Sequence, residues 1–310
     1  MRILSIDGGG IRGIIPALVL AEVESRTGRR VAELFDLIAG TSTGGILACA
    51  LTVPRARPAA ELVELYRTEG PRIFRRSLWR RIESAEGLLD EKHDDAGLNA
   101  ALADYLGTAQ LSDATTRVLV TAYDLEGREP YFFKSWRPDR DAPMVAVARA
   151  TSAAPTYFEP AAVGALGLVD GGVFATNPAM CAYAEAVRLA QEAGARVDVR
   201  VVSLGTGRMT RPIHLADAKG WGLVEWVRPV IDVVFDGVAD TVEYQLTQIL
   251  GPAAYDRFQT DLDHASDALD DASAENLKRL EWEATELISA RSADLDRVCE
   301  ALLAVAGPGA

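Results

Sequence analysis

The sequence predicts an α/β fold with a largely parallel sheet, and three observations lead to this prediction. Short apolar segments typical of buried strands alternate with longer amphipathic segments typical of helices over residues 2–204. Three of the predicted strands end in glycine-rich turns that lead into a predicted helix. The chain has 310 residues, 49% of them apolar, which is enough to bury a large core. This pattern is typical of a sheet that carries helices on its faces.

The composition excludes several classes of protein. A net charge of −13 argues against nucleic acid as the main partner. No apolar run approaches the ~18–20 residues of a membrane span, and the apolar part of the N-terminus is too short for a signal peptide. The three cysteines, Cys49, Cys181 and Cys299, are too few and too scattered for a disulfide framework or a zinc site. We therefore expect a reduced, cytoplasmic protein without a metal or cofactor.

The first predicted strand, at residues 2–7, ends in the loop D-G-G-G-I-R-G, and an apolar helix is expected at residues 14–26. Consecutive glycines leave backbone N–H groups exposed to whatever binds there, and the arginine adds a positive charge. The loop therefore predicts an anion-binding cradle, for a phosphate or for a transient oxyanion. The residues of this cradle are Gly8, Gly9, Gly10 and Arg12.

The segment at residues 35–51 reads FDLIAGTSTGGILACAL and carries the strongest local signal. Its G-T-S-T-G sequence places Ser42 between Gly40 and Gly44, after one apolar run and before another. This is the G-x-S-x-G pattern of a nucleophile elbow, in which a strand turns sharply into a helix and exposes the serine oxygen. The N-terminus of the following helix would favour negative charge at the same place.

The remaining elements follow in order. After the Ser42 helix we expect helices at residues 59–69, 95–106 and 143–153, strands at 117–124, 131–136 and 197–204, and only helices beyond Arg208. Between them, GLVDGGVFATNPA at residues 167–179 has an acid, Asp170, after two apolar residues and before a glycine turn and another helix. Because these loops all follow strands, we expect them at one edge of the sheet.

A nucleophilic serine needs a base, and Asp170 is the best candidate. Of the histidines, His93, His214 and His264, none follows a strand or lies in a glycine turn. An aspartate is ionised at neutral pH, and partial desolvation raises its basicity. The residues thus predict a Ser42–Asp170 dyad, with the amides of the N-terminal glycine loop as its oxyanion hole.

The order D-G-G-G-I-R-G, G-T-S-T-G and D-G-G resembles the patatin-like phospholipase family. Residues 150–158 (ATSAAPTYF), the Asn177–Pro178 pair and residues 203–207 (SLGTG) resemble it as well. The likeness covers residues 1–207, which we expect to form the catalytic core, with a mainly helical part at 208–310 packed on the same domain.

This resemblance implies a three-layer fold with a mainly parallel central sheet and flanking helices. It also implies hydrolysis of acyl esters of phospholipids or related lipids through an acyl-enzyme, without a metal. Ser42 would be the nucleophile, Asp170 its base, and the glycine loop with Arg12 would surround the oxyanion.

Three other functional hypotheses stay open. An actin-like sugar kinase would use the glycine loop for nucleotide phosphates and Asp170 as its base, with Mg²⁺ as charge partner. An α/β-hydrolase would combine Ser42 and Asp170 with His214 or His264, in the chain order Ser, Asp, His. A binding protein without activity could keep the same fold.

The stretch at residues 72–81 suggests how such a protein could reach lipid. As a helix it would be basic on one side and apolar on the other, which is typical of segments that lie in a membrane interface. A buried apolar face with solvated arginines would look the same, so peripheral membrane contact is one of two interpretations. The arginines concerned are Arg72, Arg75, Arg76, Arg80 and Arg81.

Overall fold

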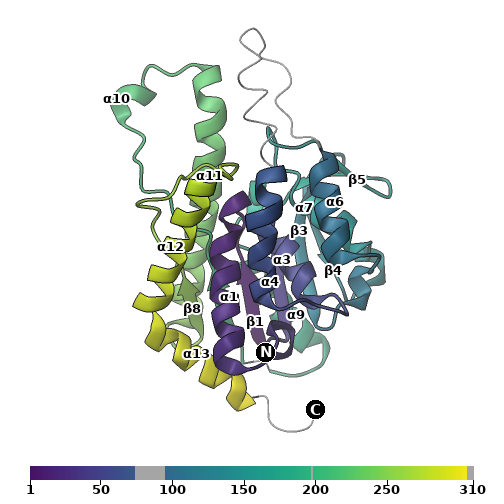
Figure 1. Cartoon of the computed structure of the whole chain (residues 1–310). Coiled ribbons are helices and arrows are strands. Elements are labelled where there is room, and N and C mark those ends of the chain that lie inside the picture. Colours follow the sequence, from purple (N-terminus) through teal and green to yellow (C-terminus); the bar gives the residue numbers. More distant parts are fainter. Residues whose placement is uncertain (74–94, 197, 306–310) are drawn as a thin grey trace.

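The computed structural model describes residues 1–73, 95–196 and 198–305. In this part of the chain, eight strands form one sheet with helices packed against both faces (Figure 1). The strands are β1 (Arg2–Ile6), β2 (Leu37–Gly40), β3 (Arg117–Asp124), β4 (Glu129–Lys134), β5 (Ala161–Val163), β6 (Leu166–Asp170), β7 (Arg200–Leu204) and β8 (Tyr255–Phe258).

The helices that flank this sheet are mostly amphipathic and of moderate length. They are α1 (Ile14–Thr27), α2 (Val31–Leu34), α3 (Thr43–Thr52), α4 (Ala59–Glu64), α6 (Asp95–Leu106), α7 (Met144–Thr151), α8 (Gly172–Ala175), α9 (Ala179–Glu192), α10 (Leu215–Ala218), α11 (Leu223–Leu250), α12 (Ala274–Ala290) and α13 (Ser292–Val305). Short 3₁₀ segments are η1 (Gly10–Gly13), η3 (Leu111–Asp113) and η4 (Pro138–Arg140), and η2 (Leu65–Glu69) is a π-helix.

The sheet is mainly parallel, as predicted. Its strand order is β5–β6–β3–β2–β1–β7–β8, with β4 on the other edge of β3. Strands β1, β2, β3, β7 and β8 run parallel to one another, whereas β4 and β6 run antiparallel to β3. The predicted α/β class and the three-layer arrangement are therefore confirmed.

Successive residues of the inner strands face opposite helical layers, because side chains alternate across a sheet. Leu4 and Ile38 belong to the larger core cluster, which includes the apolar faces of α1, α3, α6 and α7. Ile3 and Leu37 belong to a second cluster with alanines of α9. Both faces of the central strands are thus buried, which explains their continuous apolar sequences.

The expectation of helices alone beyond Arg208 is wrong, because β8 extends the sheet. Tyr255–Phe258 pairs in parallel with β7. Helices α12 and α13 pack on α1, at the opposite end of the chain. The C-terminal part therefore contributes both a strand and a helical layer to the same body (Figure 1).

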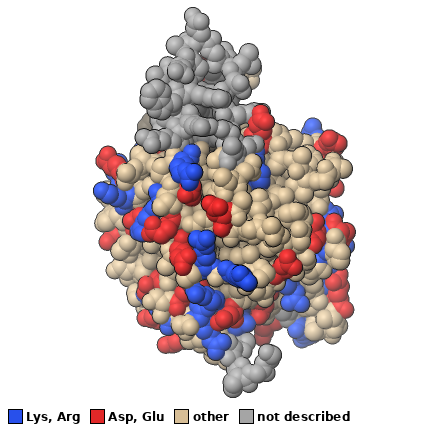
Figure 2. Space-filling view, turned by 45° about the vertical axis from the view of Figure 1, so that its right-hand side comes forward, with Lys and Arg blue, Asp and Glu red and all other residues tan. Residues whose placement is uncertain are grey.

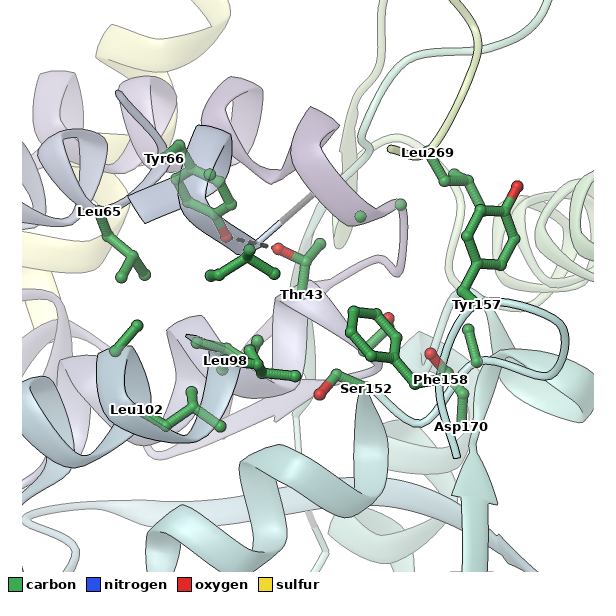
Figure 3. Close-up of a pocket in the computed structure, with 18 of the residues that line it drawn as sticks. Thr43, Leu65, Tyr66, Leu98, Leu102, Ser152, Tyr157, Phe158, Asp170 and Leu269 are labelled. Atoms are coloured by element: carbon green, nitrogen blue, oxygen red, sulfur yellow. Dashed lines mark hydrogen bonds between the residues drawn. The ribbon is translucent and has the colours of Figure 1, made fainter. Parts of the chain in front are cut away.

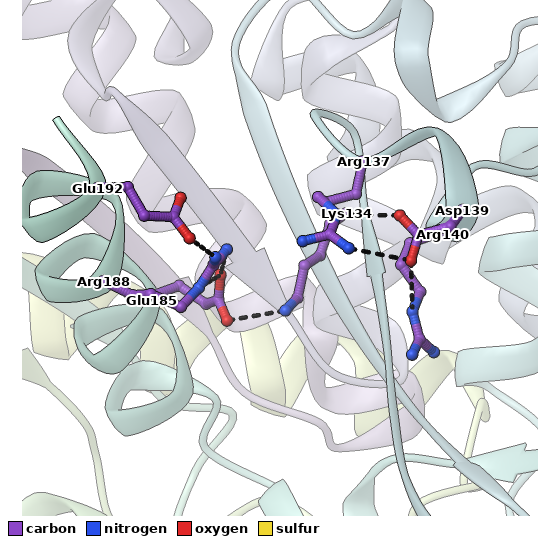
Figure 4. A network of polar contacts seen from close by, with 7 residues as sticks. All are labelled: Lys134, Arg137, Asp139, Arg140, Glu185, Arg188 and Glu192. Carbon is purple, nitrogen blue, oxygen red and sulfur yellow. Dashed lines mark hydrogen bonds and ion pairs between the residues drawn. The ribbon is translucent and has the colours of Figure 1, made fainter.

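The edge strand β4 carries an ion-pair network that links it to α9 (Figure 4). Lys134 at the end of β4 binds Glu185 of α9 at 2.7 Å, and Glu185 also binds Arg188 at 2.8 Å. Charged side chains along an edge discourage pairing with another strand. This network thus protects the open edge of the sheet.

Basic and acidic side chains are mixed on the face shown in Figure 2, with no extended area of one sign among its described residues. Within the described ranges, no helix has both the length and the apolar character required to cross a membrane.

Candidate active site

Ser42 lies in a sharp turn between β2 and α3, as the elbow pattern predicts. Its backbone has φ 55° and ψ −124°, a conformation that a non-glycine residue rarely adopts. The Ser42 amide donates a 2.8 Å hydrogen bond to Thr151 Oγ1 at the end of α7. This contact assigns a role to the segment at residues 150–158, because its Thr151 side chain helps to hold the strained turn.

The two glycines of the elbow are required by close approaches of the backbone. A Cβ on Gly40 would lie 2.1 Å from the carbonyl oxygen of Gly44. A Cβ on Gly44 would lie 2.1 Å from the carbonyl oxygen of Ile6, on the neighbouring strand. No side chain fits at these distances, so the turn can pass this close to β1 only with glycine.

Asp170 lies near Ser42 because of a strand arrangement that the sequence analysis did not predict. Strand β2 pairs with the first half of β3 up to Gly40↔Val120, and β6 pairs with its second half from Ala122↔Asp170. The two strands run in opposite directions along the same edge of β3, so their carboxyl ends meet across a single residue, Thr121. The predicted meeting of the two loops is found, but β6 is antiparallel rather than parallel.

The two oxygens of the Asp170 carboxylate have different surroundings. Oδ1 accepts a 2.7 Å hydrogen bond from the Gly172 amide, which fixes the orientation of the carboxylate. Oδ2 is buried and accepts no geometrically ideal hydrogen bond from the described residues. Burial raises the pKa of Asp170 to about 7, and hydrogen bonding from the Ser42 hydroxyl and the Gly172 amide opposes the rise. Ser42 and Asp170 are therefore neighbours whose hydrogen bond has room to tighten when substrate binds.

The prediction that all three glycine amides form the oxyanion hole requires a correction. The Gly8 amide already donates a 2.9 Å hydrogen bond to the Thr176 carbonyl oxygen. Gly9 and Gly10 line the cavity beside Ser42. An amide that is bound within the protein is not free for a developing oxyanion, so only the latter two remain as candidate donors.

The prediction that Arg12 places its charge at the oxyanion is also not met. Its guanidinium is buried outside the lining of the cavity, and it donates to the carbonyl oxygens of Gly9 (3.4 Å) and Asp267 (3.3 Å). Because the C=O and N–H of a trans peptide point in opposite directions, a bond to the Gly9 carbonyl also fixes the direction of the Gly10 N–H. Arg12 thus positions the loop rather than the substrate.

Two further contacts hold the glycine loop, and sequence reasoning did not assign them. Thr206 Oγ1 donates a 2.7 Å hydrogen bond to the Gly8 carbonyl oxygen. The amide of Ile11 donates a 2.9 Å hydrogen bond to the carbonyl oxygen of Leu269. Thr206 belongs to S-L-G-T-G, a segment that the resemblance singled out without giving it a role.

Behind the loop, Asp7 forms a buried ion pair with Arg257 of β8. The Arg257 guanidinium donates to Asp7 Oδ2 at 2.6 Å and to Ser203 Oγ at 2.9 Å. Burial raises the pKa of Asp7 to about 6, and the Arg257 charge opposes the rise. Nothing in the local sequence of Arg257 signals this partnership, because the two residues lie 250 positions apart.

Ser42 and Asp170 lie at one end of an apolar cavity with about 780 Å³ of empty space, part of it open to solvent. Figure 3 shows Leu65, Leu98 and Leu102 at the end opposite Asp170. The Thr43 and Tyr66 hydroxyls on its wall hydrogen-bond to each other at 2.5 Å. The apolar lining of the cavity suits a hydrocarbon chain.

Several other predicted residues lie away from this cavity. His214 and His264 are exposed and absent from its lining, and His264 Nδ1 lies 3.4 Å from Glu283. His93 and the stretch from residue 74 to 81 fall outside the described residues. Of the basic stretch, Arg72 is exposed and pairs with Glu69 at 2.7 Å. No group of three metal-binding side chains occurs in the described part of the chain.

Comparisons with known proteins agree on one family. A family model described as Patatin-like phospholipase matches residues 4–183. Patatin-like protein 2 of Arabidopsis thaliana is 33% identical, covering 93% of this chain and 83% of its own. Probable inactive patatin-3-Kuras 1 of Solanum tuberosum is 31% identical, covering 89% of this chain and 83% of its own.

Among solved structures, VipD from Legionella pneumophila matches with a TM-score of 0.40 at 10% identity, over 93% of this chain and 66% of that chain. A likeness this distant supports no argument about the site.

Proposed function

The chain belongs to the patatin-like phospholipase family, and we propose that it is a serine lipid acyl hydrolase of phospholipase A type. The observation that carries the proposal is the position of Ser42 at a strained elbow, beside Asp170, at the end of an apolar cavity. One relative is named probable inactive, so family membership alone does not decide activity. The proposal therefore depends on the two side chains.

In the proposed reaction, the acyl chain of a glycerolipid lies in the cavity and its ester carbonyl lies against Ser42. Asp170 Oδ2 takes the hydroxyl proton while Ser42 Oγ attacks the carbonyl carbon. The Gly9 and Gly10 amides donate to the oxyanion, and the N-terminus of α3 adds a favourable field. Collapse of the tetrahedral intermediate returns the proton to the leaving alcohol, and water then hydrolyses the acyl-enzyme in the same way.

The burial of Asp170 suits this role. A carboxylic acid with a pKa near 7 is a far stronger base than an exposed aspartate, so no histidine is required between it and the serine. The exposed positions of His214 and His264 favour this dyad over a triad that uses either of them.

Two finer expectations belong to the same proposal. A cytoplasmic location stays a prediction that rests on three cysteines, all free in the structure. Membrane contact through residues 72–81 stays a prediction from sequence, because most of that stretch lies outside the described residues.

The test is covalent labelling together with product analysis. The wild-type protein should react with a fluorophosphonate and release fatty acids from mixed phospholipids, whereas Ser42→Ala should do neither. The alanine variant should also keep or raise the melting temperature, because it removes only a partly exposed hydroxyl from a strained turn. Labelling of the Ser42→Ala variant at the wild-type rate would remove Ser42 as nucleophile. A wild-type protein that takes no label and cleaves no ester would instead be a binding protein on this fold.

A further inference from the structure

The first three turns of α11 expose a continuous apolar stripe. Leu223 is 90% exposed, and the residues that follow it at helical spacing are exposed as well. The stripe consists of Leu223, Trp226, Val230, Val233 and Val234. An exposed apolar surface of this kind on an otherwise charged protein marks an interaction site.

The acidic residues of these turns lie on the other side of the helix. At 100° per residue, Glu225, Asp232 and Asp236 fall opposite the stripe. Asp236 and Asp232 face the body, since both act electrostatically on the buried Arg12. Further along α11 the line of the stripe passes through Gly237, Thr241, Tyr244 and Gln248, so small and polar residues separate the stripe from the exposed Tyr244 ring. On α11 itself, the continuous apolar stripe is therefore uncharged and ends after the first three turns.

The segment before α11 extends this surface. Ile213 and Leu215 are exposed, Leu215 by 70%, and the rings of Trp221 and Trp226 meet edge to face at 5.1 Å. In Figure 1, α10 and the first turns of α11 protrude from the body as an arm. Paired tryptophans on a protruding arm suit the boundary between lipid headgroups and acyl chains.

The same helix connects the arm to the catalytic cavity. Phe235 directly follows the last residue of the stripe and lines the cavity that holds Ser42. At 100° per residue Phe235 falls on the face of α11 opposite the stripe, so a surface bound by the stripe would lie one helix diameter, ~10 Å, from the cavity lining. A second copy of this chain would cover the stripe equally well, but it would gain nothing from this continuity with the cavity.

We propose that the arm, residues 213–234, docks on the surface of a lipid bilayer through apolar contact and brings the cavity to its substrate. This inference rests on the proposed function for the identity of the substrate. Because the stripe carries no charge, docking should not require anionic lipid. It should also persist between about 0.01 M and 1 M salt, over which the Debye length falls from about 30 Å to 3 Å.

The experiment compares two triple variants of the full chain on vesicles of phosphatidylcholine. The first replaces part of the stripe, Leu223→Asn with Trp226→Asn and Val230→Asn. The matched control replaces three exposed apolar side chains away from the stripe, Leu125→Asn with Ile249→Asn and Trp282→Asn. Vesicle co-sedimentation measures docking, and hydrolysis of a short-chain soluble ester measures the active site without any lipid surface.

We expect the stripe variant to partition at least about tenfold more weakly than wild type, because each lost apolar side chain removes buried area. Its hydrolysis of vesicle lipid should fall in parallel, while its soluble-ester rate stays within about twofold of wild type. The control variant should match wild type in all three measurements.

Three outcomes would overturn the inference. The first is unchanged partition of the stripe variant. The second is loss of wild-type binding at high salt, which would point to basic side chains instead. The third is a wild-type dimer that the stripe variant dissociates while vesicle binding is unaltered. Failure of the proposed function would look different, since the wild-type protein would then leave the soluble ester intact whatever its partition.

Discussion

At the scale of single residues, the catalytic proposal predicts an unusual pH dependence for Asp170. With a pKa of about 7 this residue is protonated below neutrality and cannot accept the Ser42 proton. We expect kcat/KM on a soluble ester to fall about tenfold for each pH unit below about 7. A plateau that continues down to pH 5 would contradict this expectation. Because histidine titrates in the same range, His93→Ala, His214→Ala and His264→Ala must each leave the profile in place.

The same shift predicts that Asp170→Asn stabilises the inactive protein. The folded-state pKa, about 7, exceeds the ordinary value of 3.8, so between these two values the native state binds more protons than the unfolded state. The free energy of unfolding of the wild type therefore falls as pH rises through this window. Above about pH 7 the native state bears the full cost of burying the ionised carboxylate. Asparagine keeps the acceptor for the Gly172 amide but carries no charge.

The expected gain of Asp170→Asn is up to about 4 kcal/mol at pH 8 and shrinks towards zero near pH 4. Urea unfolding of both proteins at these two pH values measures it. A variant less stable than wild type at pH 8 would show that the ionised carboxylate is not under strain.

At the scale of elements, the sequence predicted those whose signal is local and missed those that depend on distant partners. The elbow was predictable because both glycines and the serine lie within five residues. Strand β8 was not, because Asp256 and Arg257 interrupt its apolar pattern and are buried only through distant ion pairs. The hydrogen bond of the Gly8 amide could not be predicted for the same reason, since its acceptor, the Thr176 carbonyl oxygen, lies far along the chain.

Strand β8 provides the element-scale prediction, because it supplies the partner of Asp7. Arg257→Met would leave the Asp7 carboxylate buried without its 2.6 Å ion pair. Breaking a buried pair by removing one partner costs about 3–5 kcal/mol, so we expect a loss of this size in the free energy of unfolding. The double variant Asp7→Asn with Arg257→Met should recover part of it, which urea unfolding at pH 7.5 can measure. Equal stability of the single variant and wild type would mean that Asp7 is already neutral.

At the scale of the whole molecule, the site is assembled from both ends of the chain. The N-terminal loop is held by Thr206 and Leu269, and the cavity is lined partly by Phe235. Family resemblance within residues 1–207 identified the motifs, but their arrangement also depends on the C-terminal part. This is why sequence motifs predicted which residues act and not what holds them in place.

This dependence predicts that residues 1–207 do not fold alone. Without residues 208–310, the edge of β7 and the face of α1 that α12 covers would both be exposed. The buried apolar side chains of α12 are Leu277, Leu280, Ala284 and Leu287. The fragment should lack a cooperative thermal transition and take no fluorophosphonate label. The full chain should unfold in one step, with equal calorimetric and van't Hoff enthalpies. A folded fragment that still labels at Ser42 would instead establish two independent units, with residues 208–310 as an accessory to a complete catalytic core.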